Sequence, residues 1–300
     1  MARKTERSDW LTEGLAEERD VFVSGSRTFS SKVDSSGLLT LRVFGHHPLH
    51  CSPPTDTEER KKWLPPRYEI PFCMLTCELE EQHEVENFSL KSEEKIRAYI
   101  TRLLKLPVYF VAYSQKNSFL KENFFVVDPS GQSRAITPQD LAAELNTRRA
   151  GRAEDEPEGR KPVNKTLNDY FQKFTRSLLS WQYSINDIDA FVRTPNGIAI
   201  LELKRSGVDP WLPYPKDVPN YLLMRSLTVK LDYAFDLTVH YDEATEGKLD
   251  IHTILNVSRD SIAGFCVPLH DSEAQSAIRK LLSMVKDNNL KPYTSTAAGK

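Results

Sequence analysis

The chain has 300 residues, a length that allows one large domain or two of ordinary size, with ample surface to bury a core. Apolar residues make up 39% and charged residues 27% of the sequence, which excludes collagen-like, coiled-coil and wholly disordered chains. The 40 Lys and Arg residues against 42 Asp and Glu residues give a net charge of -2, so any surface that binds phosphates must be local.

The sequence also predicts the cellular compartment and whether the protein associates with a membrane. The N-terminal residues are polar, and no apolar run approaches the roughly 18 residues that span a bilayer. Four cysteines are too few for a disulfide framework in a chain of this length. We therefore expect a protein with no membrane partner, in a reducing cytoplasmic compartment.

Residues 1–147 are predicted to form an N-terminal α+β region. Its first 35 residues are polar and rich in Ser and Thr. Apolar runs and helix-start signals then predict the strands Val21–Val23, Leu38–Phe44, Tyr68–Leu79, Val108–Tyr113 and Asn123–Val127, a helix at Lys91–Leu104 and a short helix from Pro138. We expect this region to provide target recognition, a homodimer contact or a surface for a protein partner.

A linker and a second region follow. Residues 148–162 carry charges of both signs, Gly and Pro, and nothing apolar larger than Ala, so we interpret 148–165 as a flexible linker or surface insertion. Residues 166–290 alternate between helix and strand signals. The predicted helices are Thr166–Trp181, Tyr221–Tyr233 and Ser272–Val285, and the predicted strands are Ile188–Val192, Ile198–Leu203, Leu237–Tyr241 and Leu249–Val257.

The two halves share a faint repeat. A strand, a helix and two strands follow from Pro71, and the same order follows from Ile198. Cys77-Glu78-Leu79-Glu80 resembles Leu201-Glu202-Leu203-Lys204. Because strand–helix alternation also recurs by chance in mixed proteins, the sequence leaves both duplication and coincidence open.

Three charged residues fall together on the hairpin predicted for residues 188–203. Glu202 and Lys204 are two positions apart on one strand, so they project from the same face, and the turn brings Asp189 beside them. The apolar run Ile198–Leu201 indicates a central strand covered on both faces, where charges are costly unless they are paired or bind an ion. The alternative is a solvated strand with all three side chains in water.

Two carboxylates and an ammonium suit phosphodiester hydrolysis. Carboxylate oxygens hold Mg²⁺, with Mn²⁺ as a substitute, and the backbone carbonyl of Leu203 is a further candidate ligand. The metal would polarise a phosphoryl oxygen and activate a water. Lys204 would position or deprotonate that water and offset the charge that builds on phosphorus. We predict Asp189, Glu202 and Lys204 as catalytic residues, with the first two and Leu203 as metal ligands.

This pattern resembles the PD-(D/E)XK, or restriction-endonuclease-like, nuclease superfamily. The resemblance covers roughly residues 166–257 and rests on Asp189, the hairpin turn and Glu202-Leu203-Lys204, with Asn186–Val192 similar to the second core strand. It implies an α/β fold in which helices flank a mixed central sheet. It also implies a magnesium-dependent nuclease of restriction, defence or repair, with DNA favoured over RNA as substrate. In that superfamily the Asp and Glu bind metal and the Lys assists the nucleophilic water.

The segment departs from the superfamily in several ways. The first helix has no glutamate, so Asp169 and Gln172 are the nearest substitutes, and Asp187 is an accessory candidate because it shares the strand parity of Asp189. The usual first core strand has little room before Asp187, and the Pro that names the motif is absent. The alternative function is a non-catalytic nucleic-acid-binding or assembly subunit that retains the fold.

Two further groups are weaker candidates. Cations, amides and aromatic rings downstream of the hairpin suit binding to phosphates and bases, although ordinary loop packing explains them equally well; they are Arg205, Lys216, Asn220, Tyr221 and Arg225. Zinc-type ligands occur in the N-terminal half, but their spacing matches no strong zinc pattern; they are His46, His50, Cys51, Cys73 and Cys77. We expect His240 and His252 to be structural.

Overall fold

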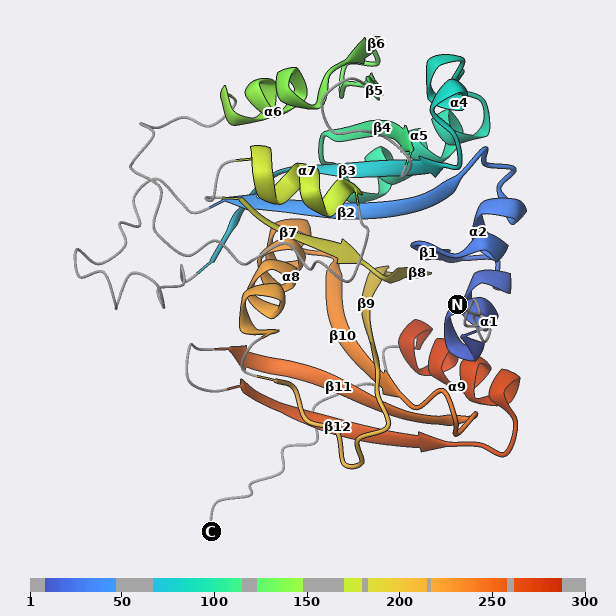
Figure 1. The fold of residues 1–300 in the computed structure, drawn as a ribbon. Helices are drawn as coiled ribbons and strands as arrows, with labels where there is room; N and C mark the ends of the chain where they lie inside the picture. The colour runs from blue at the N-terminus through green and yellow to red at the C-terminus, as the bar shows by residue number, and fades with distance from the viewer. Residues whose placement is uncertain are drawn as a thin grey trace, which may run out of the picture. The chain divides into compact units, whose positions relative to one another are not determined.

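The computed structural model describes residues 9–46, 67–114, 123–147, 170–179, 183–214, 217–257 and 262–287. These parts form a mixed α/β protein with two six-stranded sheets (Figure 1). The chain divides into unit 1, which comprises Met1–Phe29, Ile188–Tyr221 and Asp232–Lys300, and unit 2, which comprises Ser30–Asp187 and Leu222–Leu231. None of the helices in the described ranges is both long enough and apolar enough to cross a membrane.

Unit 2 contains the sheet with strand order β6-β5-β4-β3-β2-β7. Its strands are β2 (Leu38–His46), β3 (Glu69–Leu79), β4 (Val108–Ser114), β5 (Phe124–Val127), β6 (Ser133–Ile136) and β7 (Tyr183–Ile188). β3 and β4 are parallel, with α4 (Gln82–Glu86) and α5 (Ser92–Leu104) in the connection between them. β2 is antiparallel to β3, and β4, β5 and β6 are antiparallel neighbours. The helices α6 (Pro138–Thr147) and α7 (Tyr170–Leu178) pack against each other.

The core of unit 2 is built from strands that are apolar on both faces. Every residue of β4 is buried, as its continuous apolar sequence predicts for a central strand. The helix α7 adds Tyr170, Phe171 and Phe174 at helical spacing, and the ring of Phe174 meets that of Phe124 edge-on at 5.2 Å. Each fully buried side chain of this size contributes about 1.5–3 kcal/mol.

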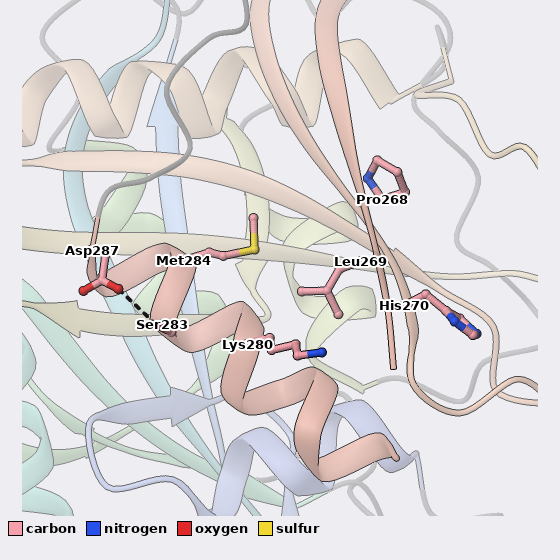
Figure 2. Close-up of a pocket in the computed structure, with 7 residues that line it drawn as sticks. All are labelled: Pro268, Leu269, His270, Lys280, Ser283, Met284 and Asp287. Atoms are coloured by element: carbon pink, nitrogen blue, oxygen red, sulfur yellow. Dashed lines mark hydrogen bonds between the residues drawn. The ribbon is translucent and has the colours of Figure 1, made fainter. Parts of the chain in front are cut away.

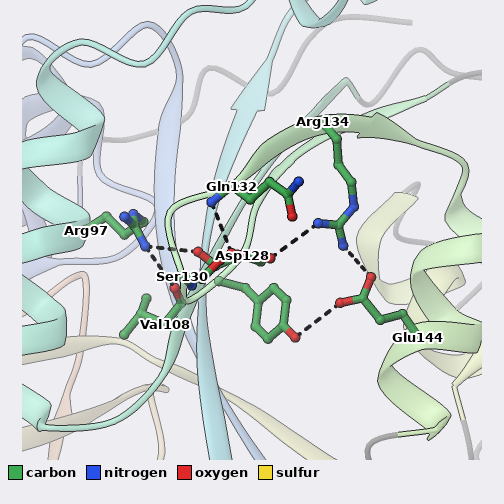
Figure 3. A network of polar contacts seen from close by, with 8 residues as sticks. Arg97, Val108, Asp128, Ser130, Gln132, Arg134 and Glu144 are labelled. Atoms are coloured by element: carbon green, nitrogen blue, oxygen red, sulfur yellow. Dashed lines mark hydrogen bonds and ion pairs between the residues drawn. The ribbon is translucent and has the colours of Figure 1, made fainter.

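A polar network holds the turn between β5 and β6 (Figure 3). The carboxylate of Asp128 accepts hydrogen bonds from the hydroxyl and N–H of Ser130, and these bonds hold its pKa below the usual value. Arg134 forms ion pairs with Asp128 and with Glu144 of α6, while Arg97 of α5 donates to the carbonyl of Asp128 at 3.3 Å. The turn is therefore tied to two helices of its own unit.

Unit 1 contains the sheet with strand order β1-β8-β9-β10-β11-β12. Its strands are β1 (Val21–Val23), β8 (Ala190–Thr194), β9 (Gly197–Arg205), β10 (Ala234–Tyr241), β11 (Lys248–Val257) and β12 (Ile262–His270). β9 and β10 are parallel, and the other neighbours are antiparallel. The helices α1 (Trp10–Glu17) and α9 (Ala274–Lys286) pack together, and the unit boundaries fall within α2 (Arg27–Lys32) and α8 (Val218–Leu231).

The β8–β9 hairpin closes at the turn that the sequence predicts. Gly197 has a φ of 156°, and a Cβ at this position would lie 1.8 Å from the carbonyl oxygen of Tyr233, so only glycine fits. Ile198–Leu201 are at most 1% exposed. β9 is therefore a central strand covered on both faces, which confirms that prediction and excludes a solvated strand.

The structure corrects the sequence prediction on either side of Asp189. The strand predicted at Ile188–Val192 is in fact the end of β7 and the start of β8, with a break at Asp189 between them, and the two strands lie in different sheets. The neighbour of β8 on the side away from β9 is β1. The helix predicted at Thr166–Trp181, which the resemblance made a flanking helix of this sheet, is α7 and belongs to unit 2. The sequence prediction also omitted α1, α2, α4, β6, β7 and β12.

Candidate active site

Glu202 and Lys204 lie on one face of β9, in unit 1, close to a second carboxylate. Glu202 is 8% exposed, and the ammonium of Lys204 lies 2.7 Å from Glu202 Oε1 and 3.7 Å from Asp217 Oδ2. Asp217 directly precedes α8. A buried strand end therefore holds a cation between two carboxylates, each of which lowers the cost of burying the other charges.

Lys204 is held in its charged form by these neighbours. Burial by itself would lower the pKa of Lys204, but the ion pair with Glu202, supported by the charges of Asp217 and Asp189, outweighs burial and raises the pKa above its ordinary value. The side chain is therefore an ammonium at neutral pH.

Asp189 joins the same cluster from the break between β7 and β8. Ala190 pairs with Leu201 in the hairpin, so the register places Asp189 opposite Glu202. The Oδ2 atom of Asp189 accepts a hydrogen bond of 2.7 Å from the N–H of Leu203. Since the N–H and C=O of one strand residue point to the same side, the carbonyl of Leu203 also faces β8. The structure thus brings Asp189, Glu202 and Lys204 together.

Tyr221 of α8 adds a buried hydroxyl to the cluster. Its side chain is 3% exposed, and its hydroxyl has no hydrogen-bond partner among the described residues. Burial, and then the charges of Asp217 and Glu202, raise its pKa, so the phenol stays neutral and keeps its proton to donate. A buried hydroxyl without a partner costs about 1–3 kcal/mol, so a group that accepts this proton would be stabilised here.

These donors fit a magnesium ion. Asp189 and Glu202 present hard carboxylate oxygens, and the unpaired hydroxyl of Tyr221 is available to an oxygen ligand or a metal-bound water. In the described ranges no three His, Cys, Asp or Glu side chains are already gathered around one point. Mg²⁺ keeps several waters and needs only one or two protein carboxylates, so two are sufficient.

A chain of hydrogen bonds fixes the strand ends beyond Lys204. The Nε2 atom of His240 lies 3.0 Å from Ser206 Oγ, and its Nδ1 atom lies 3.2 Å from Asp250 Oδ2. The order Ser–His–Asp is that of a nucleophilic triad, but Nε2 is equally close to the carbonyl of Ser206, and the ring of Trp211 stacks on the imidazole at 5.2 Å. His240 is therefore a structural tie between β9, β10 and β11.

The accessory candidates that the structure describes, Asp187 and Gln172, belong to unit 2. Asp187 belongs to unit 2, where its carboxylate lies 3.0 Å from the Nε of Arg42, whose guanidinium stacks 4.3 Å from the ring centre of Phe171. Gln172 lies on α7, also in unit 2, and Asp169 is outside the described residues. The break after β7 thus separates the roles of Asp187 and Asp189, which strand parity alone made equivalent.

The nucleic-acid-binding candidates within the described ranges differ in exposure and in charge. Arg205 lies 3.8 Å from Asp9 and 3.6 Å from Glu243, so acidic groups offset its charge. Tyr221 is buried, and an open stacking position for it is therefore wrong. Asn220 is half-buried in unit 1, Arg225 belongs to unit 2, and Lys216 lies outside the described residues.

The zinc candidates are likewise scattered or outside the described residues. Cys73 and Cys77 are buried on β3, and burial raises the pKa of each thiol to about 12. His46 pairs with Glu69 at 3.7 Å, and His50 and Cys51 lie outside the described ranges. Protonated core thiols are poor zinc ligands, so these cysteines behave as small core residues.

A shallow pocket of about 400 Å³ lies between β12 and α9 in unit 1 (Figure 2). Its charged lining groups already have partners: Lys280 lies 2.6 Å from Asp271, and Asp287 accepts from the hydroxyl of Ser283 at 3.0 Å. None of the predicted site residues lines it. This pocket therefore adds nothing to the cluster at β9.

Asp217 is the site residue that the sequence analysis missed. It stands two positions before Pro219, and an acidic residue just before a helix that has Pro in its first turn is a recognised helix-start signal. That signal predicts the position of Asp217 at the start of α8. It does not predict the approach of this helix end to β9, which depends on the loop between them.

Comparison with known proteins does not assign the chain to a family. No family model matches it, and no curated protein matches it. It is similar to the sex pheromone staph-cAM373 precursor at 9% identity over 86% of this chain and 89% of that chain, with a TM-score of 0.21. It is also similar to the C-terminal domain of that precursor from Staphylococcus aureus at 12% identity over 68% and 65% of the two chains, with a TM-score of 0.15. Scores this low carry no argument about fold or function.

Proposed function

We propose that unit 1 is a magnesium-dependent nuclease unit that hydrolyses phosphodiester bonds, with DNA as the favoured substrate. The observation that carries the proposal is the set of charges at the end of β9. The ammonium of Lys204 lies between Glu202 and Asp217 and is acted on by the charge of Asp189. The charges of Asp217 and Glu202 also act on the buried hydroxyl of Tyr221, which has no hydrogen-bond partner among the described residues. Carboxylates beside an ammonium, together with a buried hydroxyl that donates to none of the described residues, are typical of a ligand-binding site.

Each residue has a role that follows from its surroundings. Asp189 and Glu202 would hold the ion, which when bound polarises a phosphoryl oxygen and lowers the pKa of a water. Lys204 is an ammonium, so we assign it to orienting the attacking water and to offsetting the negative charge that develops on the phosphate, rather than to removing a proton. Tyr221 would donate its free proton to an oxygen of the substrate or of a bound water.

One observation favours the alternative, a nucleic-acid-binding subunit without turnover. The carboxylate of Glu202 is already paired with Lys204 at 2.7 Å, and that of Asp189 accepts from Leu203 at 2.7 Å. Metal binding would have to loosen the first pair. A permanent ion pair would instead leave a stable fold with no catalytic centre.

The test is cleavage of supercoiled plasmid, linear DNA, single-stranded DNA and RNA by the full chain in Mg²⁺ or Mn²⁺. Glu202→Gln keeps the shape of the side chain and removes its charge, so we expect metal binding and cleavage to fall together, by about 100-fold or more, the scale on which catalytic groups contribute. Equal turnover by wild type and Glu202→Gln would contradict the assignment. Nucleic-acid binding without cleavage of any substrate would favour the alternative, provided that the salt concentration is stated.

A further inference from the structure

The two units repeat one order of elements. In unit 2 the hairpin β2–β3 is followed by the short helix α4 and by α5, by β4 parallel to β3, by β5 and β6 antiparallel, and by α6. In unit 1 the hairpin β8–β9 is followed by α8, by β10 parallel to β9, by β11 and β12 antiparallel, and by α9. In Figure 1 both orders of elements can be followed by their labels as the colour runs from blue to red.

The segments before each hairpin also correspond. Along the chain, α1 and β1 come before the hairpin β2–β3, but β1 pairs with β8, in the sheet of the other hairpin. In the same way, α7 and β7 come before the hairpin β8–β9, but β7 lies beside β2. Each helix packs against the last helix of the unit it joins, α1 on α9 and α7 on α6. A matching exchange of the first strand is more than chance alternation of strands and helices would give, so it supports a duplication behind the faint sequence repeat.

The sequence likeness sets the correspondence between the two central strands. Cys77-Glu78-Leu79-Glu80 at the end of β3 resembles Leu201-Glu202-Leu203-Lys204 at the end of β9. This likeness matches Glu78 with Glu202, and Glu80 with Lys204. On the antiparallel side Leu38 pairs with Glu78, and the register of β8 puts Asp189 opposite Glu202, so Leu38 takes the place of Asp189.

Unit 2 lacks the chemistry of unit 1 at these positions. The side chain of Leu38 has no carboxylate with which to bind a metal. Glu80 is exposed and supplies a negative charge where unit 1 has an ammonium. Glu78 keeps its carboxylate, but the hydroxyl of Tyr113 donates to it at 3.2 Å, so it serves as an acceptor within the fold.

We propose that unit 2 is a copy of the nuclease unit that has lost its metal ligands and its lysine, so that each chain holds one cutting centre and nicks one strand of a duplex at a time. This inference rests on the proposed function. In each event a water oxygen forms a bond to phosphorus and gives up a proton to solvent, one P–O ester bond breaks, and the leaving oxygen takes up a proton from solvent. The second strand is cut only in a later, independent event.

The plasmid assay tests the inference with a matched pair of variants, because Glu202 and Glu78 occupy equivalent positions. With wild type and Mg²⁺ we expect supercoiled plasmid to become open circle first, and linear DNA to appear only after many nicks. Glu202→Gln should abolish both products, and Glu78→Gln should leave the rate within about 2-fold of wild type, since it is outside the centre. Direct conversion to linear DNA, or loss of cleavage in Glu78→Gln, would overturn the inference.

Counting bound Mn²⁺ by electron paramagnetic resonance separates this inference from the proposed function. We expect one ion per chain in wild type and in Glu78→Gln, and none in Glu202→Gln, with circular dichroism to verify that each variant is folded. Two ions per chain, or loss of the ion in Glu78→Gln, would overturn the single-centre inference. One ion that depends on Glu202, with no cleavage of any substrate, would support the single centre and contradict the nuclease function. A wild-type chain that binds no ion would contradict both.

Discussion

The ends of β9 and β3 occupy the same place in two sheets with the same strand order, but they differ in charge. At the end of β9 the ammonium of Lys204 lies between the carboxylates of Glu202 and Asp217. At the end of β3 the corresponding residues are Glu78 and Glu80, and no cation replaces the lysine. The same strand order thus occurs with and without this set of charges, which agrees with the general finding that function resides in particular side chains placed on a fold.

The largest expected effect comes from removing the lysine that distinguishes the two strand ends. Lys204→Ala should slow cleavage by about 10²–10³-fold, the range for one group that stabilises the charge developing in the transition state. Binding of Mn²⁺ should remain or become slightly tighter, because a positive charge beside Asp189 and Glu202 is lost. Single-turnover cleavage together with Mn²⁺ titration measures both quantities.

Glu80→Ala is the matched control for that variant, since Glu80 holds the equivalent position in unit 2. It is exposed, so we expect no change in cleavage or in stability beyond about 0.5 kcal/mol. Equal cleavage by wild type and Lys204→Ala would remove Lys204 from the reaction. A salt-sensitive loss of DNA affinity with unchanged cleavage of bound DNA would assign it to phosphate contact alone.

The second prediction concerns the carboxylate that anchors the antiparallel neighbour of the central strand in each unit. That neighbour is β8 beside β9 in unit 1 and β2 beside β3 in unit 2. In unit 1 the side chain of Asp189 accepts from Leu203 on β9, whereas in unit 2 the fully buried Glu93 of α5 accepts from the N–H of Ser36 at 2.6 Å and from the hydroxyl of Ser35 at 3.1 Å. Glu93→Gln should therefore lower the free energy of unfolding by about 1–3 kcal/mol at neutral pH, with cleavage retained. Denaturant unfolding of the full chain measures this loss.

Because the carboxylate of Glu93 titrates, the loss of stability in Glu93→Gln depends on pH. Burial alone would raise the pKa of Glu93, but the hydrogen bonds from Ser36, Ser35 and its own N–H outweigh burial and hold the pKa below its ordinary value of 4.5. The ionised form therefore stabilises the fold fully above pH 4.5, and this contribution is lost as the pH falls through the lower folded-state pKa. The difference between wild type and Glu93→Gln should shrink over that range. Glu94→Gln, on the same helix, neutralises a half-buried carboxylate that pairs with Arg97 but keeps an oxygen that can accept from it, so we expect a smaller loss than in Glu93→Gln. An equal loss in both variants would contradict a special anchoring role for Glu93.

Much of the fold can be predicted from local patterns, and the physical reason is burial. Continuous apolar runs predict the central strands β3, β4 and β9, and the turn before Gly197 predicts the β8–β9 hairpin. The segments that were missed lack such patterns: Gly14 interrupts α1, β7 is largely polar, and most residues of β12 are exposed or half-buried.

The site is only partly predictable for a different reason. Spacing on one strand puts Glu202 beside Lys204, and the hairpin puts Asp189 opposite them, because both relations are local. The approach of Asp217 and Tyr221 depends on where a loop delivers the start of α8. The pairing of β1 with β8 joins segments almost 170 residues apart, which no local pattern encodes.

The smallest expected effect compares two buried tyrosine hydroxyls, one in each unit. Tyr113 donates to Glu78, whereas the hydroxyl of Tyr221 has no partner among the described residues. Tyr113→Phe should lower the free energy of unfolding by about 0.5–1.5 kcal/mol, because it removes a made hydrogen bond, and it should leave cleavage unchanged. Tyr221→Phe should leave stability unchanged or raise it by up to about 1 kcal/mol, because it removes a buried group that gains nothing in the free protein. Tyr221→Phe should instead lower the rate of cleavage by about 2–10-fold. One hydrogen bond to a bound substrate or water is worth about 0.5–1.5 kcal/mol, and 1.4 kcal/mol corresponds to a factor of ten. Denaturant unfolding and single-turnover cleavage of the two variants measure the contrast. If Tyr221→Phe destabilises the fold as much as Tyr113→Phe and cleaves at the wild-type rate, the hydroxyl of Tyr221 is part of the fold and not of the site.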